Sequence, residues 1–445
     1  MISDDLFRDL SKIAARRADE EVEIFAESSR LVRFNGKTLS RTLKAGVSIR
    51  VVRGCVERWI AVDSLAQTDV LDGARQLRWM EDDTSRCLRT SASTQTTTGD
   101  LSLVEEQLGT LVGQAQSAMA GHADVLFSSE AGDLAQEVQV INAWGCAMDL
   151  RTRSRLVARC ARKGAAPLAV VAQNWGCSGG PQALLDQDKT AQLGELRDRA
   201  HSAANSGPSP EGPCTVVFAD GTAGVFVHEA CGHPLEGDQV LLGSVFADRV
   251  GSRVTDAGLT VVNQSRRPGG YASAERDDEG QPTSDAVLLQ DGICTGLITD
   301  RHSSRALSTD CSGSARRESF ATSPLPRMSN LVVARGSDDP RTLLSSTRSG
   351  LYVTSISGQA RTDPLTGAFA LPLAEAWVID QGELVRPVRG GFIVGDSLSA
   401  LRSIDGVGGD HTAAPAVCRK GQQNVDVMTA APTLRVRQLR VALSV

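Results

Sequence analysis

The sequence lacks the features that mark several large classes of proteins. No apolar run approaches the roughly 20 residues that a helix needs to cross a bilayer. Basic residues are not in excess, because 47 Lys and Arg stand against 53 Asp and Glu and the formal net charge is −6. This balance gives no charge-based attraction to nucleic acid or to an anionic membrane surface. We therefore expect neither partner.

The cysteines show no regular spacing. Ten are scattered along the chain, and no two of them form a CxxC pair. Such a pattern is more typical of free thiols in a reducing cytoplasm than of a disulfide framework. Residues 1–5 are acidic and begin an amphipathic pattern, whereas a secretory signal begins with positive charge. We therefore expect a cytoplasmic protein.

The overall amino-acid composition is that of a globular protein. The chain has 445 residues, 41% of them hydrophobic and 22% charged, which is enough for two or more domains. Helical periodicity covers 4–18, 65–80, 101–120 and 181–204. Strand patterns cover 21–28, 30–43, 47–54, 55–62, 123–130, 137–143, 156–161 and 166–173, with a hairpin signal at Asn35-Gly36. The isolated His122 and His201 in this half are interpreted as structural or solvated.

A second unit follows a linker rich in proline and glycine at 206–213. An apolar strand at 215–219 leads into a helix that carries His228 and Glu229. Further strand patterns cover 259–263, 286–290, 294–299, 330–334, 351–355, 368–380 and 383–394. The sequence thus predicts an α+β fold, with an N-terminal α/β domain (1–207) and a β-rich catalytic domain (208–445) wrapped around the metal-binding helix.

The helix of the second unit carries the candidate metal site. Glu229 directly follows His228, and His233 stands five positions after His228. Two neutral imidazoles can hold a zinc ion, and an adjacent carboxylate can accept a proton from water in a hydrolytic reaction. In a regular helix, residues five apart lie about 140° apart around the axis, against about 40° for residues four apart. The helix must therefore bulge or end near His233.

The residues that flank His233 predict the origin of this break. Gly232 loosens the backbone, and Pro234 biases His233 away from the α region. Catalytic zinc usually takes a third protein ligand, and the candidates in the second half are His302, His411 and several thiols. Composition alone does not choose among them.

The motif resembles the H-E-x-x-x-H…E-G-D signature of the TldD/PmbA family of metallopeptidases, because Glu236-Gly237-Asp238 follows His233. Further stretches stand in the family's order at 277–280, 313–317, 326–330, 350–353, 366–369, 418–422 and 432–436. The layout at 46–51 also agrees. The resemblance covers essentially the whole chain, strongly in the second half and more loosely in the first.

This resemblance implies a site and an activity. The third ligand in the family is a cysteine near the C-terminus, and the matching position is Cys418, a reasonable zinc ligand beside two imidazoles. One zinc ion per active site would be held by His228, His233 and Cys418, with Glu229 as general base. The implied reaction is zinc-dependent hydrolysis of peptide or peptide-like amide bonds, in peptide trimming or in processing a natural-product intermediate.

The resemblance also implies an assembly. Family members form dimers, either homodimers or heterodimers with a catalytically inactive homologue. The dimer encloses the site in a chamber that admits unfolded peptides or peptide-like small molecules. Because this chain retains the ligand set, it resembles the catalytic subunit. The alternative is a non-catalytic pairing subunit with a structural zinc, which a fourth protein ligand such as His302 or His411 would close.

The sequence allows two interpretations for several residues near these motifs. Glu236 and Asp238 either orient an imidazole or form a simple turn. The acidic run 277–279 either is a solvated turn or lines the site. The pair 316–317 either grips a substrate carboxylate or backbone or pairs with that acidic run. Cys231, inside the motif, is interpreted as a packing residue.

Overall fold

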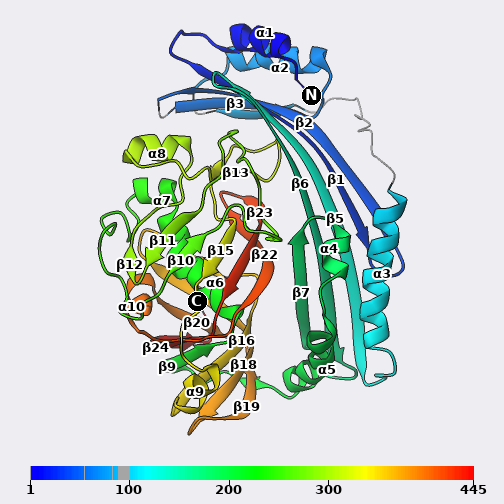
Figure 1. Cartoon of the computed structure of the whole chain (residues 1–445), viewed down its shortest axis with the longest axis vertical. Helices are drawn as coiled ribbons and strands as arrows, with labels where there is room; N and C mark the ends of the chain where they lie inside the picture. The colour runs from blue at the N-terminus through cyan, green and yellow to red at the C-terminus, as the bar shows by residue number, and fades with distance from the viewer. Residues whose placement is uncertain (1, 55, 83, 89–100, 445) are drawn as a thin grey trace.

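The computed structural model describes residues 2–54, 56–82, 84–88 and 101–444, and it shows a strand-rich α+β fold (Figure 1). The elements of the first half are α1 (Asp4–Ala14), β1 (Glu21–Phe34), β2 (Leu39–Arg53), β3 (Val56–Val62), α2 (Gln67–Arg78), β4 (Ser85–Leu88), α3 (Ser102–Ala118), β5 (Val125–Asn142), β6 (Gly145–Arg162), β7 (Val170–Ser178), α4 (Pro181–Leu185) and α5 (Thr190–Ala204). The predicted α+β class is confirmed, while the division at residue 207 stays a prediction.

The second half begins with short elements around the motif helix and continues mostly in strands. Its elements are β8 (Gly207–Pro208), β9 (Gly212–Phe218), α6 (Thr222–Val227), a π-helix η1 (His228–Gly232), a 3₁₀-helix η2 (His233–Leu235), α7 (Gly237–Leu241), β10 (Val261–Asn263), β11 (Ala286–Gln290), β12 (Ile293–Cys294), α8 (Arg301–Leu307), β13 (Ala315–Arg316), β14 (Leu325–Pro326), β15 (Asn330–Val333), α9 (Pro340–Ser345), β16 (Ser349–Ile356), β17 (Arg361–Thr362), β18 (Ala368–Asp380), β19 (Glu383–Arg389), β20 (Phe392–Asp396), α10 (Ser397–Arg402), β21 (Ile404–Val407), β22 (Thr412–Lys420), β23 (Gln423–Ala431) and β24 (Leu434–Ala442).

The first half forms one long curved sheet that lies alongside the second half in Figure 1. Its strand order is β4-β3-β2-β1-β5-β6-β7, and β5 and β6 pair over 18 residues each. Successive side chains of a strand point to opposite faces. On β1, Ile24 packs with α1 and α2, and Val32 packs with α3, α4 and α5. Phe25 lies on the opposite face, against Phe320 of the second half. One face therefore carries the helices, and the other supports the second half.

The hairpin predicted at Asn35-Gly36 is confirmed. β1 and β2 pair in antiparallel fashion across it. The Asn35 side-chain oxygen accepts the backbone N–H groups of Lys37 (3.0 Å) and Thr38 (2.8 Å). Gly36 has a φ of 83°, in the left-handed region that glycine adopts without strain. Local turn chemistry was therefore sufficient to place this hairpin.

Three predictions of element length are wrong. The segments 123–130 and 137–143 belong to one strand, β5, because the residues between them also stay extended and pair with β6. The predicted helix 181–204 is two helices, α4 and α5. The chain turns between them, and there the side chain of Asp188 accepts the N–H of Thr190 at 2.9 Å just before the second helix. The strand predicted at 294–299 is not formed over that range, because β12 ends at Cys294. Cys55 and the loop predicted at 90–98 lie outside the described residues.

One hydrophobic core joins the two main sheets of the second half to the motif helix. The larger sheet has the order β16-β9-β24-β20-β18-β19-β8, and the smaller has the order β12-β11-β10-β15-β23-β22. Phe226 of α6 stacks on Phe218 of β9, with ring centroids 5.1 Å apart. The same core includes Leu331 of the smaller sheet and Val436 of the larger one. This packing fixes the helix from which the candidate ligands project.

The helices of the first half are amphipathic. The Ser3 hydroxyl caps α1 by accepting the N–H of Leu6, and α1 buries Leu6, Leu10 and Ala14. Within the ranges that the structure describes, no helix is both long enough and apolar enough to cross a membrane.

Candidate metal centre

The motif helix changes its winding where the two histidines stand. α6 passes at His228 into one π-helical turn that ends at Gly232, and the His233 N–H donates to the His228 carbonyl. A π turn closes hydrogen bonds between residues five apart, so it brings such residues to the same side of the helix. The two imidazole centroids are 4.8 Å apart. The bulge predicted from the spacing is therefore present.

The predicted cause of the bulge is wrong. His233 keeps right-handed helical angles (φ −58°, ψ −44°), and Pro234 fits the first turn of η2, where its missing N–H does no harm. The chain leaves the helix only at Glu236. Gly232 is also helical, but a Cβ there would stand 2.1 Å from the Sδ of Met328. Gly232 is thus required for close packing rather than for flexibility.

Three candidate ligands meet at this point. The Nε2 atoms of His228 and His233 each lie 3.3 Å from the Sγ of Cys418 on β22. The three donor atoms lie within 4.8 Å of one another, and all three residues are buried. Burial would raise the pKa of the Cys418 thiol, but His233 and His228 hold it well below its usual value. Two imidazoles and a thiolate form a donor set that fits zinc.

The other candidates for the third ligand lie elsewhere. His302 is exposed on α8, and the Nε2 of His411 contacts the carbonyl of Val333 at 3.0 Å. Among the residues that the structure describes, neither belongs to the cluster of donor atoms. Cys231 is buried in the hydrophobic core, as its interpretation as a packing residue predicted.

A buried carboxylate orients one of the imidazoles. Glu236 accepts the Nδ1 hydrogen bond of His233 at 2.9 Å, so the Nε2 atom is free to face Cys418. The Lys420 ammonium lies 2.9 Å from the same Glu236 oxygen and 2.7 Å from Asp238. Burial would raise the pKa of Glu236, but Lys420 and His233 hold it well below its usual value. The interpretation of Glu236 as an orienting residue is therefore the correct one.

The roles of two cations near the site were not predicted from the sequence, although both lie in stretches that resemble the family. Lys420 stands two residues after Cys418 on β22, so both side chains lie on the same face of the strand. That spacing was the available signal. Arg327 donates to the Cys418 carbonyl at 2.8 Å, but no local pattern links these two residues, which are 91 positions apart.

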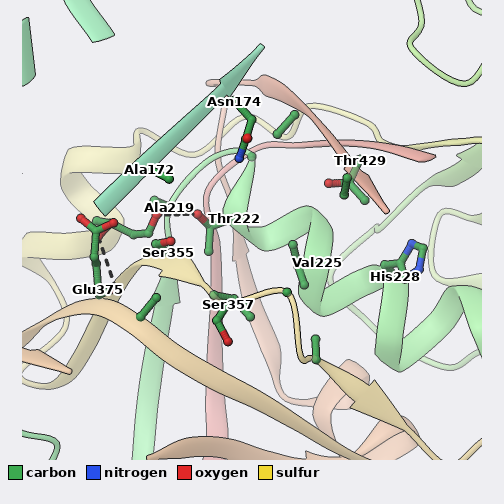
Figure 2. Close-up of a pocket in the computed structure, with 18 of the residues that line it drawn as sticks. Ala172, Asn174, Ala219, Thr222, Val225, His228, Ser355, Ser357, Glu375 and Thr429 are labelled. Atoms are coloured by element: carbon green, nitrogen blue, oxygen red, sulfur yellow. Dashed lines mark hydrogen bonds between the residues drawn. The ribbon is translucent and has the colours of Figure 1, made fainter. Parts of the chain in front are cut away.

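The cluster opens onto a cavity of about 1330 Å³ between the first-half sheet and the second half. In Figure 2, Asn174 on β7, Ser357 after β16 and His228 on the motif helix approach this space from different elements. Glu229 lines the same cavity but remains 7% exposed. Burial raises its pKa, an effect that His233 and the neighbouring His228 oppose. The space is large enough for an extended peptide segment.

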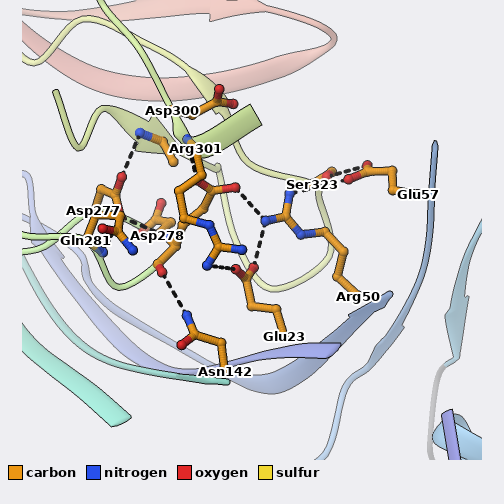
Figure 3. A network of polar contacts seen from close by, with 12 residues as sticks. Glu23, Arg50, Glu57, Asn142, Asp277, Asp278, Gln281, Asp300, Arg301 and Ser323 are labelled. Carbon is orange, nitrogen blue, oxygen red and sulfur yellow. Dashed lines mark hydrogen bonds and ion pairs between the residues drawn. The ribbon is translucent and has the colours of Figure 1, made fainter. Parts of the chain in front are cut away.

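The acidic run 277–279 is neither solvated nor part of the site. All three side chains are buried. Asp278 accepts from Arg151 of β6 at 2.7 Å. Glu279 accepts at 2.5 Å from Arg50 of β2, which Figure 3 shows among the acidic residues. The Asn142 amide donates to the Glu279 carbonyl at 3.3 Å. These contacts tie the second half to the first-half sheet, and both original interpretations of the run are corrected.

The two following arginines behave differently. The Arg317 N–H donates to a carboxylate oxygen of Asp278 at 2.7 Å, and its guanidinium lies 3.4 Å from Glu23. Arg317 thus pairs with the acidic run, as one interpretation held. Arg316 instead donates to the carbonyl of Met328 at 2.6 Å.

Comparisons with known proteins find both similar sequences and similar structures. Residues 211–443 match the family model of the PmbA/TldA metallopeptidase C-terminal domain. Similarity to a protein of Haemophilus influenzae named metalloprotease TldD homolog reaches 32% identity over 236 residues, 52% of this chain and 49% of that protein. A zinc metalloprotease TldD homolog of Saccharolobus solfataricus is 28% identical over 251 residues, 56% of each chain. The chain spans about half the length of the curated relatives that it matches.

Solved structures share the whole fold. TldE from Thermococcus kodakarensis matches with a TM-score of 0.73 at 16% identity, covering 98% of this chain and 99% of that one. A Thermotoga maritima protein matches with a TM-score of 0.74 at 19% identity and the same coverage. At these identities the likeness concerns the fold alone.

The contact between Gly232 and Met328 generates a test of the π turn. Gly232→Ala should lower the free energy of unfolding by about 1–3 kcal/mol, because the added methyl group overpacks against the buried Met328. The matched control is Gly113→Ala in α3, where an added Cβ meets open space. This substitution should raise the free energy of unfolding by about 0.4–1 kcal/mol. Denaturant unfolding measures both, and equal behaviour of the two variants would contradict the packing role of Gly232.

Proposed function

The chain belongs to the PmbA/TldD family, and from that premise we propose that it is a zinc-dependent peptidase. The proposed reaction is hydrolysis of peptide or peptide-like amide bonds. The observation that carries the proposal is the convergence of His228, His233 and Cys418 beside Glu229 at the wall of one large cavity. The names of the curated relatives support peptidase activity at the level of the family.

The metal site has a simple assignment. The Nε2 atoms of His228 and His233 and the thiolate of Cys418 would hold one zinc ion. Zinc bound there would polarise the scissile carbonyl and lower the pKa of a water molecule. Three protein donors among the described residues leave one position for a non-protein ligand, which favours a catalytic role over a closed structural site. The name of the Saccharolobus solfataricus relative supports zinc as the metal.

Glu229 is the proposed general base. It follows His228 directly and lines the cavity, yet it is not one of the three clustered donors. Its raised pKa moves the carboxylate toward the range in which proton transfer near neutral pH is efficient. Glu229 would take the proton of the attacking water and pass it to the leaving nitrogen. Glu236 would keep the His233 ring in its orientation throughout.

The cavity suggests how an extended substrate binds. β7 is the last strand of its sheet, β22 is the last strand of the smaller sheet of the second half, and residues of both line the cavity. A sheet edge offers unpaired backbone groups, so an unfolded peptide could add to one of these edges as a further strand. Recognition through backbone groups would suit peptides of varied sequence. A peptide-like natural-product intermediate would use the same space.

Cys418→Ser tests the ligand set. Serine is a poor zinc ligand at neutral pH, so the purified variant should contain far less than the one zinc per chain expected of the parent. Cys146→Ser is the control, because Cys146 is exposed and remote in sequence from the cluster. Elemental analysis after dialysis gives the result. Undiminished zinc in Cys418→Ser would remove Cys418 from the site.

We further propose that the active form is a dimer, of identical chains or with a homologue. Met148 and Leu150 near the start of β6 are 55% and 73% exposed, and apolar side chains grouped in this way are typical of a surface that another chain covers. Sedimentation of the active species should give at least twice the chain mass of 47.1 kDa. A fully active monomer would contradict the proposed assembly.

Glu229→Gln separates an enzyme from a scaffold. The variant should keep its zinc and lose about 10²–10⁴-fold in kcat, because an amide cannot accept the proton. Glu195→Gln is the matched control, since Glu195 lines the same cavity and lies outside the donor cluster, and its kcat should stay close to that of the parent. Hydrolysis of an unstructured peptide is the assay. Full activity of Glu229→Gln would place the base elsewhere, and loss of zinc would make Glu229 a support of the site.

A further inference from the structure

Four arginines meet behind the strand that carries Cys418. Arg151 and Arg153 come from β6, Arg316 from β13, and Arg327 from the segment after β14. Arg151, Arg153 and Arg327 are buried, and Arg327 is 0% exposed. Burial, followed by the nearby charges of Arg153, Arg327 and Arg151, lowers the pKa of Arg316 to about 9, although the charge of Asp278 opposes this shift. The four guanidinium groups are thus close enough to repel one another.

The surrounding carboxylates compensate only part of this charge. Arg151 pairs with Asp278 at 2.7 Å and with Asp149 at 3.0 Å. Within the described ranges, no carboxylate lies within ion-pair distance of Arg153, Arg316 or Arg327. Arg316 and Arg327 donate instead to backbone carbonyls, those of Met328 and Cys418. The Nε atoms of Arg153 and Arg327 are buried without any hydrogen-bond partner.

Such a cluster is unfavourable unless a further negative charge lies within it. Arginine stays protonated in proteins, so it cannot escape burial by losing its charge as lysine does. Buried charges are normally paired, and orphaned buried donors point to an ion or a water molecule that completes the site.

A small cavity lies beside three of these four arginines, and Arg153 does not line it. Its volume is about 20 Å³, and Arg151, Arg316 and Arg327 line it together with the hydroxyl-bearing Ser314 and Ser329. This space holds one water-sized or chloride-sized occupant and is too small for the carboxylate end of a peptide. The metal-site residues do not line it.

Asp277 also lines this cavity, but its oxygens are already engaged. They accept the backbone N–H groups of Glu279 (3.0 Å), Gln281 (2.8 Å) and Ala315 (3.1 Å). Burial and the neighbouring Glu279 raise its pKa well above the usual value, an effect that these three hydrogen bonds oppose. Because its oxygens are engaged with backbone N–H groups, Asp277 makes no ion pair with the arginines of the cluster within the described residues.

We propose that this cavity binds one small inorganic anion of the size of chloride. The anion would accept hydrogen bonds from Arg316 and Arg327 and would supply the missing negative charge. Because Arg151 belongs to the first-half sheet, the anion would link the two halves of the chain. Arg327 also donates to the Cys418 carbonyl. By holding Arg327 in place, the anion would therefore also hold β22, the strand that carries this metal ligand.

The test compares thermal unfolding of the zinc-loaded, full-length chain in sodium chloride and in sodium gluconate at equal ionic strength. At saturating chloride the parent should gain about 3 °C in Tm, because a ligand that binds only the folded state stabilises it. Arg316→Gln should lose this shift, and in gluconate it should be at least as stable as the parent, since it removes an uncompensated charge. Arg348→Gln, a change at an exposed arginine, should keep the full shift.

Two outcomes would overturn the proposal. One is an equal Tm of the parent in the two salts. The other is a full chloride shift in Arg316→Gln, which would place the anion elsewhere, for example at the zinc. Anomalous diffraction from parent crystals grown in sodium bromide decides the matter without a variant. A bromide peak between Arg316 and Arg327 is expected, and an ordered water molecule in its place would refute the anion site.

Discussion

The proposed chemistry depends on one π-helical turn. Residues five apart cannot face one ion from a regular helix, and the hydrogen bond from the His233 N–H to the His228 carbonyl closes the wider turn that removes this obstacle. A wider turn is less favourable than an α-helical one, so the surroundings must hold it. Met328 packs against Gly232 on one side, and the stacked Phe226 anchors the helix just before the turn. The close packing of the second half thus selects the winding that the site requires.

Charge is distributed in shells around this turn. Cys418 faces both imidazoles, Glu236 faces His233, and Lys420 faces Glu236, so positive and negative groups alternate outward from the donor atoms. Each member of this chain of contacts therefore has a partner of opposite sign, which limits the free energy lost on burial. The arginine cluster behind β22 breaks this alternation, and there the structure points to a charge from outside the chain.

The sequence predicted those parts of the molecule that depend on local chemistry. The Asn35-Gly36 hairpin, the bulge at His233 and the pair of imidazoles follow from spacing over a few residues, and Cys418 came from the family resemblance. The parts that depend on distant partners were not predictable in the same way. The acidic run 277–279 is buried because Arg50 and Arg151, 229 and 127 positions away from Glu279 and Asp278, neutralise it. Strand periodicity also failed for β5, where buried polar residues interrupt the alternation of apolar and polar positions.

The central claim is that two histidines brought together by the π turn and one cysteine from β22 form an open zinc site. X-ray absorption at the zinc K-edge of the purified chain tests it most directly, because it counts the ligand types around the metal. The account predicts one sulfur at about 2.3 Å, two imidazole nitrogens at about 2.0–2.1 Å and one further light atom from solvent. A spectrum without sulfur, or one with two sulfurs, would contradict it.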